Sequence, residues 1–353
     1  MDLDILTISA GNGWMKQEER FSGNIAGKEQ KNYTLLHKGE LSYNHGNSKL
    51  AKYGAVFSLQ NFEEALVPRV YHSFKMLSGS AKFIEYYFAT KLPDRELGKL
   101  ISSGARMDGL LNIKYDDFMG IKLTIPSEME QHKISTFFSK LDNTITLQQR
   151  KLNSLQKLQK RLLQKMFPKK GENIPEIRFP EFSDAWKQRK FGEFVERKSD
   201  SALSSTSIPS VEYENVESET GILKKDIYVK TEFKKGVLFS DKDVLYGKLR
   251  PYLHNWLAPS FTGVAVGDWW VLSPKNCSKD FLYRLLQTLT FDEIANQTSG
   301  TKMPRADWNL VSSTAFYIPS SIEEQAKIGS LFNRIDSTIT LQQRWLFYTH
   351  KQS

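Results

Sequence analysis

The sequence has a single cysteine, Cys277, so the chain cannot form an intramolecular disulfide. Its longest uncharged apolar runs fall short of the roughly 18 residues that a membrane-spanning helix needs. The six histidines show neither an HExxH motif nor a Cys/His ligand spacing, which excludes the usual zinc-site patterns. The first 14 residues carry two aspartates and no basic stretch, so we expect a cytoplasmic protein that is not attached to a membrane.

Motifs of catalysis are equally scarce. The sequence has no P-loop ending in GK(S/T), no GxSxG elbow and no (D/N)PP(Y/F) tetrapeptide, and its Gly11-Asn12-Gly13 lacks the rest of a dinucleotide fingerprint. One alternative stays open, because Asp226, Glu232 and Lys234 have the residue types of a metal-dependent nuclease. Acid-x-Lys triplets are common by chance, so we expect a non-catalytic chain that holds no metal or cofactor of its own.

What the sequence does have is basic charge and enough apolar residues for two cores. Lysine and arginine exceed aspartate and glutamate by 49 to 40, which gives a net charge of +9. This balance favours a polyanionic partner without proving one. The 353 residues, 40% of them hydrophobic, correspond to two or three domains.

The chain contains an internal repeat. Residues 130–152 match residues 324–346 at 14 of 23 positions, with an offset of 194. The pair Ile125-Pro126 recurs as Ile318-Pro319, and residues 103–107 recur as residues 299–303. The unit is therefore a variable globular segment followed by a constant segment, used twice.

Each constant segment predicts a helix with a heptad seam. Apolar residues alternate at spacings of four and three, and no glycine or proline interrupts residues 130–166. The seam of the first copy is Ile134, Phe138, Leu141, Ile145, Gln148, Leu152, Leu155, Gln159, Leu162 and Met166. The second copy keeps the register through Ile328, Phe332, Ile335, Ile339, Gln342 and Leu346. A helix packed on its own domain is the alternative interpretation of such a stripe.

Two seams in one register favour the pairing of the helices with each other. The first helix delivers the chain to the second globular segment, so a paired second helix must run back, and the pair is antiparallel. This arrangement implies a pseudo-twofold axis, with the globular segments at opposite ends. Gln148 and Gln342 occupy the same position in the two copies, where a buried polar residue could set the register.

The remaining sequence predicts mixed α/β globular segments joined by an extended linker. Short strands are expected at residues 237–239, 243–246 and 264–272, and helices at residues 81–90 and 281–289. Residues 39–44 resemble residues 242–247, whereas the two segments otherwise differ strongly. The linker is rich in proline and ends the first helix at Phe167.

Polar, basic and aromatic residues in the loops are candidates for DNA contact. Lysine and arginine neutralise phosphates, and arginine, lysine, asparagine and histidine also bond base edges. Any single one of them can equally be a solvated surface residue, but as a group on corresponding loops they favour double-stranded DNA. The candidates are Asn44, His45, Lys49, Arg106, Lys248, Arg250, Tyr252, Lys302 and Arg305.

Several segments resemble the DNA specificity subunit of type I restriction-modification systems. They are FPEFSDAWKQRKFGEF at residues 179–194, VLYGKLRPY at residues 244–252, and the two EQxKI helices with their TITLQQR ends. The resemblance covers nearly the whole chain. It implies two mixed α/β target-recognition domains, separated by two long antiparallel coiled-coil helices in a pseudo-twofold tandem repeat. Its domains would be residues 1–127, a spacer helix at 128–168, a linker at 169–185, residues 186–320, and a second helix at 321–353.

The same resemblance implies that each recognition domain reads one half of a bipartite DNA site and that the helices set the spacing. Methyltransferase subunits would dock on the helices, and restriction/translocase subunits would complete the complex. S-adenosylmethionine, ATP and Mg would be used by those partners and not by this chain. The implied spacer and docking positions are Glu130, Gln131, Ile134, Phe138, Leu141, Ile145, Leu152, Glu324, Gln325, Ile328, Phe332, Ile335 and Ile339.

The chain departs from this pattern at two places. Nothing before Met1 corresponds to residues 179 to about 208, so the first recognition domain is expected to lack its opening segment. The second helix matches through Leu346 and then loses the Leu-rich basic continuation of residues 155–166. A truncated or silent specificity cassette, active only after recombination or with a partner fragment, is therefore the main alternative.

Overall fold

The computed structural model describes residues 3–21, 31–46, 48–101, 110–224, 227–228, 232–297 and 303–352. The chain divides into two compact units, residues 1–144 and residues 145–353. Each unit is mixed α/β, and each contains one part of the long helix α5, Glu128–Lys165. No described helix is both long enough and apolar enough to cross a membrane.

Unit 1 is built from short strands and short helices. Its central sheet has the order β5-β4-β7, and two further two-stranded ladders are β1-β2 and β3-β6. Its elements before α5 are β1 (Leu6–Ser9), β2 (Gly13–Lys16), α1 (Gln17–Arg20), β3 (Thr34–His37), β4 (Leu41–Asn44), β5 (Ala55–Ser58), β6 (Glu64–Val67), β7 (His72–Phe74), α2 (Ala81–Ala89), α3 (Asp94–Lys99) and α4 (Tyr115–Met119).

Among the described residues, unit 2 has two four-stranded sheets, β16-β15-β18-β9 and β10-β14-β17-β11, and two two-stranded ladders, β12-β13 and β19-β8. Its elements are β8 (Lys187–Lys190), α6 (Phe191–Phe194), β9 (Val195–Lys198), β10 (Ser201–Leu203), β11 (Ser210–Val211), η2 (Tyr213–Asn215), β12 (Val216–Glu217), β13 (Ile222–Leu223), β14 (Lys235–Phe239), β15 (Val244–Gly247), η3 (Pro251–Leu253), β16 (Trp256–Leu257), β17 (Gly263–Ala265), β18 (Trp269–Pro274), α7 (Lys279–Leu285), α8 (Leu289–Ala295), α9 (Trp308–Ser313), β19 (Ala315–Ile318) and α10 (Ile322–Gln352).

The central sheets of the two units correspond strand by strand. β4 pairs with β5 and β7 in unit 1 as β15 pairs with β16 and β18 in unit 2. Tyr43 and Tyr246 occupy the same place on the middle strand and are both buried. The adjacent Trp269 and Trp270 point to opposite faces of β18 and enter different core clusters, as alternation along a strand requires.

To within one residue, β14 and β15 cover the strands expected at residues 237–239 and 243–246, and α2 covers the helix expected at residues 81–90. The strand expected over residues 264–272 is instead two strands, β17 and β18, because the chain turns at Gly267, whose φ is +96°. The helix expected over residues 281–289 ends with α7 at Leu285, and α8 begins at Leu289.

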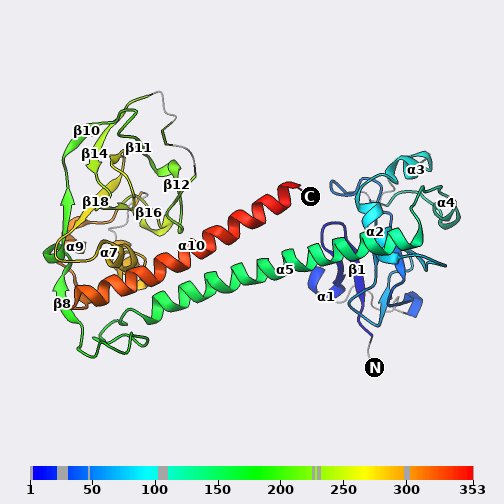
Figure 1. The fold of residues 1–353 in the computed structure, drawn as a ribbon, viewed down its shortest axis with the longest axis horizontal. Helices are drawn as coiled ribbons and strands as arrows, with labels where there is room; N and C mark the ends of the chain where they lie inside the picture. Colours follow the sequence, from blue (N-terminus) through cyan, green and yellow to red (C-terminus); the bar gives the residue numbers. More distant parts are fainter. Residues whose placement is uncertain are drawn as a thin grey trace. The chain divides into compact units, whose positions relative to one another are not determined.

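Helices α5 and α10 pack antiparallel within unit 2, as the two seams predict (Figure 1). Leu152, Ile339 and Leu346 form the buried centre of the seam, flanked by Ile145, Leu155 and Ile335. The Gln342 side-chain amide donates to the Gln148 carbonyl, and the Gln159 amide donates to Asp336. Later residues of α5 therefore meet earlier residues of α10. Two equivalent residues in direct contact, Gln148 and Gln342, place a local pseudo-twofold axis between them.

Candidate nucleic-acid interface

In unit 2, three predicted DNA-contact residues lie together. Lys248 and Arg250 follow β15, and Arg305 lies in the loop beside them. The Arg250 amide donates to the Pro304 carbonyl at 2.7 Å, and Leu249 forms a β-bridge with Arg305. Lys248 donates its amide to the Asp268 carbonyl and accepts from the Ala306 amide. The two loops are thus held side by side, and their basic side chains come from both of them.

Asp268 lies at the centre of this basic group. Its carboxylate is 3.5 Å from the Lys248 ammonium and receives two hydrogen bonds from Arg305, at 3.3 and 3.1 Å. Partial burial acts to raise the pKa of Asp268, but the ion pairs with Arg305 and Lys248 outweigh it and lower this pKa. We name Lys248, Arg250, Asp268 and Arg305 the basic loop cluster. Nothing in the sequence marks Asp268, since its role depends on contacts between loops that are distant along the chain.

Tyr213 fixes the backbone beneath the basic loop cluster. Its hydroxyl donates to the Asp268 carbonyl at 2.8 Å and accepts from the Leu249 amide at 2.9 Å. Its ring packs against Trp269, with centroids 4.7 Å apart. A partly buried tyrosine therefore joins both loops by hydrogen bonds from below. Tyr252, in η3, is 52% exposed and free to contact a ligand.

In unit 1, two of the predicted DNA-contact residues are engaged inside the protein. The Asn44 side chain donates to the Ile8 carbonyl and accepts from the Gly46 amide. The His45 ring is 5% exposed and lies 3.3 Å from the ring nitrogen of His72. Both residues therefore shape the loop after β4, and neither presents its side chain freely on the surface.

Lys49 remains exposed on the same loop. The loop returns tightly at Gly54, which has a φ of +85°, and a Cβ there would lie 2.5 Å from the Asn44 carbonyl oxygen. Only glycine fits that return, so the loop that carries Lys49 has a defined shape. The remaining predicted residues, Arg106 and Lys302, lie outside the described residues.

Equivalent glutamines join each globular part to its helix. The side-chain carbonyl of Gln131 accepts from the Ser80 amide, which precedes α2, and its amide donates to the Pro126 carbonyl. Gln325 does the same with the Ser278 amide, which precedes α7, and the Pro319 carbonyl. Both glutamines are buried. These two predicted spacer residues therefore act inside the chain, at the junction of helix and globular part.

A second contact recurs about three turns further along each helix. In unit 2, the buried guanidinium of Arg284, on α7, donates to Asn333 at 2.7 Å and to Asp336 at 2.6 Å. In unit 1, the Tyr86 hydroxyl, on α2, donates to Asp142 at 2.6 Å. Asp142 and Asp336 are equivalent by the 194-residue offset. The same aspartate of each helix thus accepts a hydrogen bond from a different side chain, a tyrosine in unit 1 and an arginine in unit 2.

The glutamates at the helix starts differ between the repeats. Glu324 is 1% exposed, accepts two hydrogen bonds from Arg178 at 2.7 and 2.8 Å, and accepts a third from the Trp186 indole. Its equivalent, Glu130, is exposed and caps the helix by accepting from the Ser127 hydroxyl and amide. The remaining predicted spacer residues are distributed along α5 and α10.

The nuclease alternative gains no support from the described residues. Asp226 lies outside them, and Lys234 donates to Glu212 at 2.8 Å and not to Glu232. The hydrogen bond to Glu212 raises the pKa of Lys234. The described part of the chain contains no group of three or more His, Cys, Asp or Glu side chains arranged to hold a metal ion.

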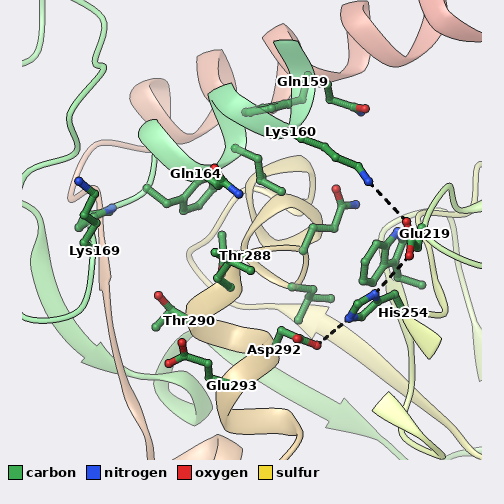
Figure 2. Close-up of a pocket in the computed structure, with 18 of the residues that line it drawn as sticks. Gln159, Lys160, Gln164, Lys169, Glu219, His254, Thr288, Thr290, Asp292 and Glu293 are labelled. Atoms are coloured by element: carbon green, nitrogen blue, oxygen red, sulfur yellow. Dashed lines mark hydrogen bonds and ion pairs between the residues drawn. The ribbon is translucent and has the colours of Figure 1, made fainter. Parts of the chain in front are cut away.

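A pocket of about 600 Å³ in unit 2 lies apart from the basic loop cluster (Figure 2). Lys160, Glu219, His254 and Asp292 form a line of charged and polar contacts across it. The Asp292 carboxylate lies 2.9 Å from the His254 ring nitrogen. This pocket lies between the end of α5 and the globular part of unit 2, and no predicted DNA-contact residue lines it.

Comparison with known proteins identifies one family. A family model for the type I restriction modification DNA specificity domain matches residues 3–157 and again residues 183–346. The two matched segments together cover most of the chain and follow the internal repeat. No curated protein matches the sequence.

Three solved structures are similar to the chain. The S subunit of a type I restriction-modification system from M. genitalium is 16% identical, with a TM-score of 0.50, and the match covers 89% of this chain and 80% of that one. The HsdS subunit from Thermoanaerobacter tengcongensis is 12% identical, with a TM-score of 0.47 and coverages of 88% and 76%. A chain from a study of complex assembly and conformational transition of the type I R-M system is 12% identical, with a TM-score of 0.48 and coverages of 90% and 79%. The M. genitalium structure shows a likeness of fold.

Proposed function

The chain belongs to the family of type I restriction-modification DNA specificity proteins, and on this premise we propose that its two repeats read the two halves of a bipartite double-stranded DNA site. The family supplies the non-catalytic specificity component of the system. The finer assignment is that residues 1–127 and 186–320 are the recognition domains. Residues 128–168 and 321–353 would be the spacer helices, with a linker at 169–185.

The antiparallel seam is the observation that carries this proposal. Gln148 and Gln342, which are equivalent in the repeat, meet on a local twofold axis, and the apolar seam extends from them in both directions. A pair of helices related in this way can hold two recognition domains at a set separation. The gap between the two half-sites would then follow from the length of the helices.

The basic loop cluster supports DNA contact in the second recognition domain. Lys248 and Arg305 carry positive charge into two adjoining loops, and Arg250 is held in a left-handed backbone conformation between them. Arginine and lysine can neutralise phosphates and can also bond guanine in the major groove. In the first recognition domain, Lys49 is the described candidate that remains available.

The chain would act in the cytoplasm, in a complex with DNA, methyltransferase subunits and restriction/translocase subunits. S-adenosylmethionine, ATP and Mg would belong to those subunits. The test is to sequence methylated DNA from cells with and without this gene, while the partner genes are expressed. Loss of one bipartite methylation motif on deletion supports the proposal, and an unchanged methylome contradicts it.

An incomplete recognition cassette is the second candidate function. It is favoured by the central sheet of unit 1, which has three strands among the described residues, whereas that of unit 2 has a fourth, β9. Such a chain would need recombination or another fragment for activity. Purified chain that binds methyltransferase subunits and directs methylation of its site without any further fragment would contradict this candidate.

A further inference from the structure

In unit 2, the last turn of α5 and the residues after it cover part of the core and of the start of α10. We name residues 162–198 the cover segment. Leu162 and Leu163 pack on the core cluster that contains Phe332, and Phe167 stacks on Phe281 with ring centroids 5.4 Å apart. Further along, Arg178 and Trp186 bond Glu324, β8 pairs with β19, and β9 extends the central sheet.

Equivalent positions in unit 1 are exposed. Phe138 is 41% exposed, whereas its equivalent, Phe332, is 1% exposed. Ile125 is likewise 41% exposed, against 1% for Ile318 in the recurring Ile-Pro pair. Glu130 is exposed as well, as described above. The phenylalanine and the isoleucine that the two repeats share are therefore buried in unit 2 and exposed to solvent in unit 1.

The backbone shows the same difference. Residues 315–318 form β19 and pair with β8, whereas the described residues 121–125 of unit 1 form no strand. Leu123 still packs on the core cluster of unit 1, as Phe316 packs on that of unit 2. One side of this segment is thus anchored. The Ile121 amide donates to the Phe118 carbonyl, whereas the amides of residues 122–125 bond no other described residue and can pair with an added strand.

We name residues 121–125, Glu130 and Phe138 the open face. On α5 between the last two, Ile134 is partly buried and packs on the core cluster of unit 1. Along α5 the open face continues the seam, because Phe138, Leu141 and Ile145 follow one another in the heptad. The apolar strip offers a site for a helix, and the Glu130 carboxylate offers a site for a cation beside it. The cover segment has both features in this order, in Leu162 and then Arg178.

We propose that the open face binds a segment of another polypeptide with the chemistry of the cover segment. That segment would bring a leucine-rich helix end, an arginine for Glu130 and an edge strand for residues 121–125. The match is defined by the internal repeat, because the chain itself shows how such a segment fits on the equivalent surface. DNA recognition is not needed for this contact, so the two proposals can fail separately.

The test uses the full chain and a synthetic peptide of residues 162–190 that carries a fluorophore at its N-terminus. Fluorescence anisotropy should show saturable binding of one peptide per chain. Hydrogen exchange of the amides in residues 122–125 should slow when the peptide is bound, because an added strand forms hydrogen bonds with their backbone groups. No saturable binding would overturn the proposal.

Matched variants decide whether the peptide sits on the open face. Glu130→Gln keeps the helix cap but removes the charge, and it should weaken binding about tenfold. Phe138→Ser should weaken binding to a similar extent. The controls are Glu128→Gln and Leu147→Ser, which change exposed positions on α5 outside the open face and should leave the affinity for the peptide unchanged. Binding that is indifferent to Glu130 and Phe138 would overturn the proposal.

A double-mutant cycle identifies the charge contact. With a peptide that carries Arg178→Gln, the change Glu130→Gln should have no further effect, because the pair is already broken. Additive losses would contradict the pairing. Sedimentation of the chain alone distinguishes a second copy from a different polypeptide: a dimer that Phe138→Ser dissociates would overturn the assignment to another chain.

Discussion

The two repeats attach their globular parts to their helices in the same way but present different side chains in their loops. Gln131 and Gln325 make the same pair of hydrogen bonds, and Asp142 and Asp336 both receive a donor from the adjoining short helix. The loop after β4, in contrast, holds Asn44 and His45 inward, while the loop after β15 carries residues of the basic loop cluster.

The residues that hold each globular part to its helix are thus shared by the two repeats, whereas the loop residues proposed to contact DNA are not. Helix positions that fix a junction are repeated because both junctions need the same geometry. Loop positions differ because each would read a different sequence of bases, and nothing in the junction depends on them. Four changes test this difference, beginning with the one that should have the largest effect.

Replacing Arg284 should damage unit 2 more than the equivalent change damages unit 1. Arg284→Ala leaves Asp336 partly buried without its cation, and it should lower the free energy of unfolding by about 3–5 kcal/mol. Tyr86→Phe removes one hydrogen bond and should cost about 1 kcal/mol. Urea unfolding followed by tryptophan fluorescence reports on unit 2, which holds six of the seven tryptophans. Circular dichroism covers unit 1, and equal losses would contradict this comparison.

The buried carboxylate of Asp243 should make unit 2 sensitive to acid. Burial acts to raise its pKa, but hydrogen bonds from Lys198 and Ser240 lower it below 3.8. The unfolded chain therefore binds this proton more tightly than the folded chain. The stabilisation is present above pH 3.8 and is lost as the pH falls through the lower folded-state pKa. Asp243→Asn should cost about 2 kcal/mol at pH 6 and less near pH 2.

The matched change in unit 1 is Glu40→Gln, at the position equivalent to Asp243. The Glu40 side chain is 27% exposed, so its loss should cost less than that of Asp243. Urea midpoints measured at pH 6 and near pH 2 provide the check. A cost of Asp243→Asn that stays the same at both pH values would contradict the role given to Lys198 and Ser240.

Asp268→Asn should strengthen binding to DNA of arbitrary sequence. The change releases Lys248 and Arg305 from their ion pairs, so that both can neutralise phosphates. We expect the affinity for non-cognate duplex to rise by about threefold to tenfold at low salt, with a steeper dependence on salt. Titrations of labelled duplex at several salt concentrations measure both quantities. Unchanged affinity would show that the basic loop cluster does not touch the backbone.

The smallest effect is expected from single lysines in the two loops. Lys248→Ala and Lys49→Ala should each reduce the slope of log K against log salt by about 0.9, if each side chain neutralises one phosphate. Lys151→Ala, on the exposed surface of α5, is the control and should leave the slope unchanged. An effect of Lys248 without one of Lys49 would mean that only the second repeat meets DNA through this loop.

The sequence predicted the helices well because their signal is local and repeated. The heptad residues Ile145, Leu152 and Ile339 pack as their spacing requires. The seam also ran through Phe138, which the structure leaves 41% exposed, because the register of a helix does not reveal which part of it has a partner.

The DNA-contact residues were harder to predict, since residue type does not reveal where a side chain points. Histidine can contact bases, which makes His45 a candidate by residue type, but His45 lies buried beside His72. Asp268 was missed because its partners, Lys248 and Arg305, come from loops distant in sequence. The sequence does not mark Arg284, and it predicts Gln131 and Gln325 as spacer residues without showing that they bond the residues just before α2 and α7.

The most direct test of the central claim is the form of the DNA motif that the chain selects in the presence of methyltransferase subunits. Random duplexes retained by the complex should share two short conserved elements, separated by a gap of constant length and free sequence. One continuous motif, or two elements at varying separation, would contradict the claim that the paired helices hold two readers a set distance apart.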